Sequence, residues 1–178
     1  MKNSKFSTRA IHAGQSPDPL SGAVMTPVYL TSTYVQQGIG QNKGGEYSRV
    51  SNPTRDALEQ NIAAMENGRH GMAFGSGMAA IDAIFRLLKP GDHVVVSANV
   101  YGGTYRIGKD VWEHFGLSFS FVDTTKVDHI AEAITEKTRM LFVETPTNPT
   151  MEITDLHAVG KFAHQHRLIS VCDNTFET

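Results

Sequence analysis

Apolar residues recur at helical spacing directly after a glycine-containing segment near the middle of the chain. Four of them, at i, i+3, i+4 and i+7, share one helical face: Ile81, Ile84, Phe85 and Leu88. An apolar segment, residues 71–74, precedes them, and Gly75-Ser76-Gly77 lies between the two. The pattern predicts a strand, a glycine turn and a helix, and the first N–H groups of such a helix can bind an anion. An ordinary tight turn is the alternative, and this segment alone does not distinguish the two.

Short apolar segments alternate with amphipathic segments from residue 70 onward. Strands are predicted at residues 71–74, 94–96, 117–122, 140–143 and 168–172. Further helices are predicted at residues 104–115, 127–135 and 155–166. Strands that alternate with helices form right-handed βαβ units, which give a mainly parallel sheet covered on both faces. We therefore predict an α/β fold in which a mainly parallel sheet is flanked by helices.

Residues 1–55 differ from the rest of the chain, because they contain several prolines and glycines and show little hydrophobic periodicity. Tyrosines in this segment argue against disorder, which is the alternative. We expect residues 1–55 to form an extended arm that packs on a partner subunit. A helix is predicted at residues 55–67, with Thr54 as its N-cap and Gly68 at its end.

The composition excludes several classes of protein. With 178 residues and a net charge of −2, the chain has no general affinity for nucleic acids or anionic membranes. No apolar segment approaches the roughly 20 residues of a membrane-spanning helix, and the N-terminus lacks the apolar core of a signal peptide. The single cysteine, Cys172, cannot form an internal disulfide and is expected to be a buried, inert thiol. A cytoplasmic location is the expectation.

Polar residues follow the ends of the predicted strands. They are Ser76, Asn99, Tyr101, Glu144, Thr145, Asn148, Asp173, Asn174 and Thr175. The carboxyl ends of parallel strands meet at one edge of the sheet, so we expect these residues to converge there. A phosphate-binding turn, an aromatic ring, an amide and a carboxylate suggest a phosphorylated heteroaromatic cofactor. Asp173 follows a buried strand and needs a cationic partner, such as a protonated ring nitrogen, unless it only caps the next turn.

Tyr47 and Arg49 stand two residues apart near the end of the arm. In an extended segment, side chains two residues apart point the same way. A phenol beside a guanidinium can hold a phosphate or a carboxylate. The alternative is a solvated arginine in a loop.

Five motifs, in order, resemble those of the Cys/Met-metabolism enzymes that use pyridoxal phosphate. They are Tyr47-Ser48-Arg49 with Asn52-Pro53-Thr54, Ser76-Gly77-Met78-Ala79-Ala80, Tyr101-Gly102-Gly103-Thr104, Glu144-Thr145-Pro146-Thr147-Asn148-Pro149 and Asp173-Asn174-Thr175-Phe176. The family includes cystathionine γ-synthase, cystathionine γ-lyase, methionine γ-lyase and the homoserine-ester sulfhydrylases. The resemblance implies the large domain of a fold-type I aminotransferase-like enzyme. It also implies trans-sulfuration at the γ-carbon of a sulfur amino acid or activated homoserine, in methionine and cysteine metabolism.

The resemblance also implies which residues would bind the cofactor: Tyr47, Arg49, Gly77, Met78, Tyr101, Asn148, Asp173 and Thr175. The backbone N–H groups of Gly77 and Met78 would bind the phosphate. Tyr47 and Arg49 would reach the phosphate in the neighbouring subunit of a homodimer or homotetramer, so the arm would serve the partner's site.

The pyridine ring of the cofactor would lie between several of these side chains. Tyr101 would stack on it, Asn148 would contact its hydroxyl, Thr175 would lie against it, and Asp173 would keep its nitrogen protonated. Tyr101 and Asp173 are therefore the expected catalytic residues. Substrate binding is implied for Arg49, Tyr101 and Arg106. Asn99 receives no role.

One part of the family pattern is missing from this sequence. The Schiff-base lysine of the family lies in a Ser-x-Thr-Lys segment downstream of Asp-Asn-Thr-Phe, and this sequence ends at Thr178. We therefore expect residues 56–178 to be the incomplete N-terminal part of a pyridoxal-phosphate-binding domain, and the chain by itself to be inactive.

Three alternatives stay open at this point. Methionine γ-lyases usually carry a cysteine where Gly103 stands, so the pattern favours the cystathionine enzymes, and synthase, lyase and sulfhydrylase are not distinguished. A truncated, non-catalytic scaffold that keeps the dimer surface is a second possibility. A metal site formed by His157, His164 and His166 is the third, and it is disfavoured because no cysteine or carboxylate completes it.

Overall fold

The computed structural model describes residues 4–177, and the chain divides into two compact units, one up to Gly75 and one from Ser76 onward. Helix α2 (Pro53–Met65) therefore belongs to the first unit. From the sequence we expected the arm to end at residue 55, near the start of this helix. Among the described residues, no helix is long and apolar enough to cross a membrane.

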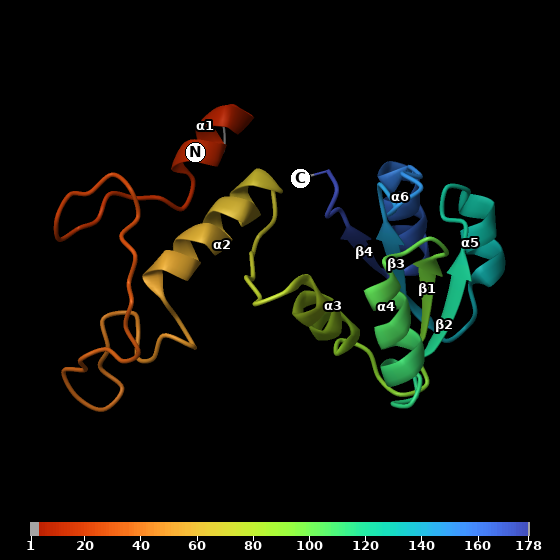
Figure 1. Ribbon diagram of the computed structural model, residues 1–178, viewed down its shortest axis with the longest axis horizontal. Coiled ribbons are helices and arrows are strands. Elements are labelled where there is room, and N and C mark those ends of the chain that lie inside the picture. The colour runs from red at the N-terminus through yellow and green to blue at the C-terminus, as the bar shows by residue number, and fades with distance from the viewer. Residues whose placement is uncertain (1–3, 178) are drawn as a thin grey trace. The chain divides into compact units, whose positions relative to one another are not determined.

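The second unit is built on a parallel four-stranded sheet (Figure 1). Its strands are β1 (His93–Ser97), β2 (Ser118–Val122), β3 (Thr138–Glu144) and β4 (Ile169–Asp173). They lie in the order β2-β1-β3-β4, and every neighbouring pair is parallel. The prediction of an α/β fold with a parallel sheet is confirmed.

Helices cover both faces of this sheet (Figure 1). The helices of this unit are α3 (Gly77–Phe85), α4 (Gly102–Arg106) with the π-helix η1 (Ile107–Trp112), α5 (Val127–Ala133) and α6 (Leu156–His166). Helices α3 and η1 pack on the face that carries Val94 and Val96, while α5 and α6 pack on the face that carries Val95. This alternation along β1 explains why a strand buried on both faces is apolar throughout.

The first of these two cores is centred on Phe85, which is fully buried. Its ring centroid lies 5.5 Å from that of Phe119 on β2 and 5.6 Å from that of Phe142 on β3. Helix α3 is therefore anchored to the sheet at its C-terminal end, which fixes the position of its N-terminal end.

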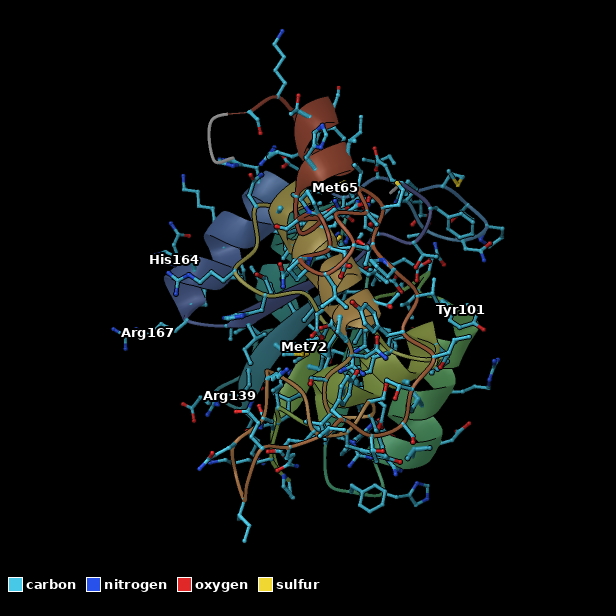
Figure 2. The ribbon with its side chains drawn as sticks, turned by 90° about the vertical axis from the view of Figure 1, so that its left-hand side faces the viewer. Met65, Met72, Tyr101, Arg139, His164 and Arg167 are labelled. Atoms are coloured by element: carbon cyan, nitrogen blue, oxygen red, sulfur yellow. The ribbon has the colours of Figure 1, made fainter. Side chains whose placement is uncertain are left out.

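The strand order creates a switch point between β1 and β3. The chain leaves β1 toward β2 on one side and leaves β3 toward β4 on the other. The two connections run apart, and in open parallel sheets a ligand binds in the crevice that this leaves at the carboxyl ends of the strands. Figure 2 labels Tyr101 after β1 and Arg139 near the start of β3, at opposite ends of the sheet.

The first unit contains α1 (Phe6–His12) packed against α2. Asn61 of α2 donates hydrogen bonds from Nδ2 to the carbonyl oxygens of Ala10 and Ala13, at 3.0 and 2.9 Å. Gly14 follows with φ of 71°, and a Cβ there would lie 2.7 Å from Gln60 Cβ, so only glycine fits.

Several local predictions were wrong. Residues 71–74 form no strand, because no described strand pairs with them, and Met72 and Phe74 are exposed. The N-cap of α2 is Asn52, whose side chain accepts from Thr54 N, and the chain turns at Asn67 (φ 54°) before Gly68. Cys172 is exposed, because β4 is an outer strand of the described sheet.

Helix α6 begins at a strong side-chain cap, and its removal gives a measurable cost. Asp155 Oδ1 accepts hydrogen bonds from the N–H groups of His157 and Ala158, at 2.9 and 3.0 Å. We expect Asp155→Ala to lower the free energy of unfolding by about 1 kcal/mol. Asp155→Asn keeps an acceptor and should lose much less. Equal urea midpoints for the two variants would contradict the cap.

A buried histidine makes stability depend on pH. Burial lowers the pKa of His93, whose ring nitrogens contact the Thr138 and Ser120 hydroxyls at 2.8 and 3.0 Å. The unfolded chain therefore binds a proton more readily, so the free energy of unfolding should fall as the pH drops below about 6.5. His93→Gln should flatten this dependence, whereas the exposed His164→Gln should not. Urea unfolding at several pH values measures it, and identical slopes for wild type and His93→Gln would refute it.

Candidate active site

A pocket of about 410 Å³ opens in the second unit, where the carboxyl ends of β3 and β4 meet the beginning of α3. Its lining residues are Ser76, Gly77, Met78, Ile81, Tyr101, Glu144, Asn148, Asp173, Thr175 and Phe176. Six of the nine polar residues that were predicted to converge line this pocket, whereas Asn99, Thr145 and Asn174 do not.

The first turn of α3 forms one wall of the pocket. Ser76 is the N-cap, and its Oγ accepts a hydrogen bond from Ala79 N at 3.2 Å. The N–H groups of Gly77 and Met78 stand at the first two helical positions, where no carbonyl of the same helix can accept from them. A Cβ added at Gly77 would meet no described atom within 4 Å. The turn therefore offers N–H donors and open space to an anion.

Tyr101 forms another wall, and its ring lies directly over Gly103. A Cβ at Gly103 would lie 2.3 Å from Tyr101 Cε1 and 2.7 Å from Met78 Sδ. Gly103 itself is buried, whereas 45% of the Tyr101 surface is exposed. The missing side chain at position 103 thus lets the phenol ring settle between α4 and the start of α3.

Asn148 stands on a loop whose threonine hydroxyl groups accept hydrogen bonds from nearby backbone N–H groups. Thr145 Oγ1 accepts from Thr154 N at 3.0 Å, and Thr147 Oγ1 accepts from Glu152 N at 3.0 Å. All three threonines are buried. This internal bracing fixes the backbone on either side of Asn148, whose side chain is exposed toward the pocket.

Asp173 is the last residue of β4, and one of its two oxygens is already occupied. Asp173 Oδ1 accepts from the N–H of Thr175 at 3.2 Å and from its hydroxyl at 2.5 Å. Among residues 4–177, no donor reaches Oδ2, which is available to a cationic ligand. The alternative role of a turn cap is thus also real, because Asp173 caps the turn with one oxygen.

Glu144 is a carboxylate at the base of the pocket, 3% exposed. Oε2 accepts from Tyr101 N at 2.6 Å and Oε1 accepts from Asn148 N at 3.0 Å. Burial raises the pKa of this carboxyl, the nearby Asp173 charge adds to the rise, and the two N–H donors oppose it. The sequence placed Glu144 at a strand end but gave it no role.

Three of the residues with a predicted binding role lie outside this pocket. Tyr47 and Arg49 belong to the first unit, where Arg49 Nη2 donates to the Tyr47 hydroxyl at 2.7 Å. The two side chains contact each other, but a turn, and not the expected extended segment, brings them together. Arg106 lines a neighbouring hollow of about 380 Å³ that shares Met78 and Tyr101 with the pocket. Asn99 instead donates to Glu152 Oε1 at 2.7 Å.

The histidines considered as a metal site do not assemble one. Within residues 4–177, no group of three His, Cys, Asp or Glu side chains could hold a metal ion. His166 instead stacks on Phe162, with ring centroids 4.3 Å apart.

The pocket can be compared with known proteins. The family described as "Cys/Met metabolism PLP-dependent enzyme" matches residues 7–178. The chain belongs to this family. The family depends on pyridoxal 5′-phosphate (PLP), as the resemblance in the sequence implied.

Relatives within the family carry several activities. The chain is 54% identical to cystathionine β-lyase of Coxiella burnetii, over 99% of this chain and 46% of that protein. It is 45% identical to cystathionine γ-synthase of Mycobacterium leprae, over 96% of this chain and 45% of that protein. The crystal structure of cystathionine γ-lyase from Lactobacillus plantarum, complexed with L-serine, matches with a TM-score of 0.94 and 48% identity, over 98% of this chain and 46% of that one. The chain thus spans about half the length of the relatives it matches.

The pocket fits the cofactor of the family. The open first turn of α3 suits a phosphate, the Tyr101 ring suits an aromatic face, and Asp173 Oδ2 suits a protonated ring nitrogen. These three groups suit different parts of the cofactor, and all of them line the same pocket.

Proposed function

We propose that this chain belongs to a PLP-dependent trans-sulfuration enzyme of the cystathionine γ-synthase or γ-lyase type. Such an enzyme would act at the γ-carbon of a sulfur amino acid or an activated homoserine. The observation that carries the proposal is the pocket itself. Six of the eight residues that the resemblance assigns to the cofactor line it: Gly77, Met78, Tyr101, Asn148, Asp173 and Thr175.

The roles follow from the chemistry of each group. The N–H groups of Gly77 and Met78 bind the phosphate at the positive end of the α3 dipole. Tyr101 covers one face of the ring and keeps water from it, while Asn148 donates to the ring hydroxyl. Thr175 lies against the ring, and its bonds to Asp173 Oδ1 orient that carboxylate.

Asp173 carries the electrostatic part of the mechanism. Bound PLP would supply an electron sink for the electrons released at the α-carbon of the substrate. The Asp173 carboxylate holds a proton on the ring nitrogen, which keeps the ring able to accept those electrons. The negative charge is in place before the reaction begins, so little reorganisation is needed.

The first unit has a separate part in the proposal. Tyr47 and Arg49 form a hydroxyl–guanidinium pair that suits a phosphate, and they would serve the neighbouring subunit's cofactor in a homodimer or homotetramer. Arg106 borders the hollow beside Tyr101, where it would meet a substrate carboxylate. Arg49 and Tyr101 would contribute to the same substrate contacts.

A second candidate reaction is cleavage at the β-carbon, because the β-lyase of Coxiella burnetii is 54% identical to this chain. The sulfhydrylases and methionine γ-lyase of the family are further alternatives, and Gly103 argues against the last. Product analysis with cystathionine separates β- from γ-cleavage, because the two routes release homocysteine and cysteine respectively.

The decisive experiment is the intact mass of the natural protein, taken before and after borohydride reduction in the presence of PLP. A gain of one reduced cofactor per subunit, with turnover of cystathionine or an activated homoserine, supports the proposal. Cofactor binding without a covalent adduct or turnover would favour the other class of function, a non-catalytic scaffold that keeps the cofactor pocket.

A further inference from the structure

Glu144 joins the two loops that diverge at the switch point of the sheet. It ends β3, where its backbone pairs with Asp173 of β4. Its Oε2 accepts from the backbone of Tyr101, in the connection that follows β1, at 2.6 Å. Its Oε1 accepts from the backbone of Asn148, in the connection that follows β3, at 3.0 Å. One buried carboxylate therefore spans the crevice.

Both bonds act on backbone rather than on side chains. Tyr101 is the N-cap residue of α4. The position of its N–H therefore determines where α4 begins and from which point the phenol side chain extends into the pocket. Asn148 stands at the opposite side of the crevice, on the loop braced by threonines. The distance between the aromatic wall and the amide wall of the pocket is thus set through one side chain.

Glu144 is itself held from below by a chain of buried hydroxyl groups. Its N–H donates to Ser97 Oγ at 3.1 Å, and Ser97 Oγ lies 2.7 Å from Thr124 Oγ1. Thr124 Oγ1 lies 2.9 Å from Thr154 Oγ1 in turn. These contacts connect the ends of β1, β2 and β3, and they hold the backbone of Glu144 in place.

We propose that Glu144 is a positioning residue, which fixes Tyr101 and Asn148 relative to each other across the pocket. What those two residues hold rests on the proposed function, whereas the two hydrogen bonds do not. A carboxylate is suited to this role because both of its oxygens are acceptors. A glutamine has the same shape but offers one acceptor, and its amide group would oppose the other N–H.

The test uses Glu144→Gln in the natural protein, with Glu152→Gln as the matched control. Glu152 also joins the two loops, through Asn99, but it lies outside the pocket. We expect Glu144→Gln to weaken PLP binding roughly fivefold, the equivalent of one lost hydrogen bond. It should also change the circular dichroism of the bound cofactor, which reports the orientation of the ring. Glu152→Gln should change neither.

A double-mutant cycle shows whether Glu144 acts through Tyr101. In a Tyr101→Ala background, Glu144→Gln should lose part of its effect on PLP binding, because the ring it positions is gone. An undiminished effect, or a Glu144→Gln variant with wild-type affinity and dichroism, would overturn the proposal.

Amide hydrogen exchange tests the same bonds without a cofactor. The N–H groups of Tyr101 and Asn148 should exchange slowly in the wild-type protein, and Glu144→Gln should release one of them. If the N–H groups of Tyr101 and Asn148 in the wild-type protein exchanged as fast as the N–H of Gly102, the proposal would be overturned. This outcome does not depend on whether the variant folds. A wild-type protein that protects both groups but binds no PLP would refute the proposed function and leave the role of Glu144 intact.

Discussion

Replacing Asp173 with asparagine in the natural protein is expected to lower turnover by roughly 10²–10³-fold, the usual cost of losing a preorganised electrostatic contact in an active site. Asparagine keeps an Oδ1 that can accept from the N–H and hydroxyl of Thr175, so the turn after β4 should survive. The charge that would hold a proton on the ring nitrogen is lost. Steady-state kinetics and the absorbance of the bound cofactor measure both consequences.

Glu177→Gln is the matched control, because it removes the same charge from the same segment without lining the pocket. It should retain wild-type turnover. If Asp173→Asn turned over like the wild type with an unchanged absorbance spectrum, Asp173 would be only a turn cap. If the urea midpoint of Asp173→Asn fell so far that the variant was largely unfolded in the assay, the loss of activity would be assigned to folding.

Gly103→Ala is the second substitution with a large expected effect, and it should act on the pocket rather than on the fold. The new Cβ would lie 2.3 Å from Tyr101 Cε1, so the ring must move. Because the ring is 45% exposed and the other close atom is Met78 Sδ, both can shift without breaking the core. Loss of ring stacking should weaken PLP binding by up to roughly tenfold.

Gly160→Ala provides the comparison, since a Cβ at this position in α6 would meet no described atom within 4 Å. It should raise the free energy of unfolding by up to about 1 kcal/mol through helix propensity and leave PLP affinity unchanged. Equal PLP affinities for wild type and Gly103→Ala would show that Tyr101 does not need its position over Gly103.

Hydrophobic periodicity predicted most of the second unit, because α3, α5, α6, β1 and β3 bury apolar residues. The strand expected at residues 71–74 failed for a different reason: an apolar segment becomes a strand only beside a partner backbone, and no described strand supplies one. The prediction that Cys172 is buried failed for a similar reason, because the burial of a side chain on β4 depends on what covers an outer strand. Local composition does not contain either kind of information.

The candidate site was predictable where it depends on strand ends. Asn148 and Asp173 follow predicted strands, so the rule for parallel sheets brought them to one edge. The role of Glu144 was not predictable, because its partners are backbone N–H groups that every residue possesses. The approach of Tyr101 to Gly103 was equally hidden, although a glycine inside a helix is a signal worth following.

The outer position of β4 has a consequence for handling this polypeptide. Within the described residues β4 pairs only with β3, and along its other side backbone N–H and C=O groups can template the pairing of another strand. Its exposed Ile169 adds an apolar surface to that edge. A preparation of this segment by itself therefore risks aggregation that grows with concentration, and dilute, cold conditions are the sensible start.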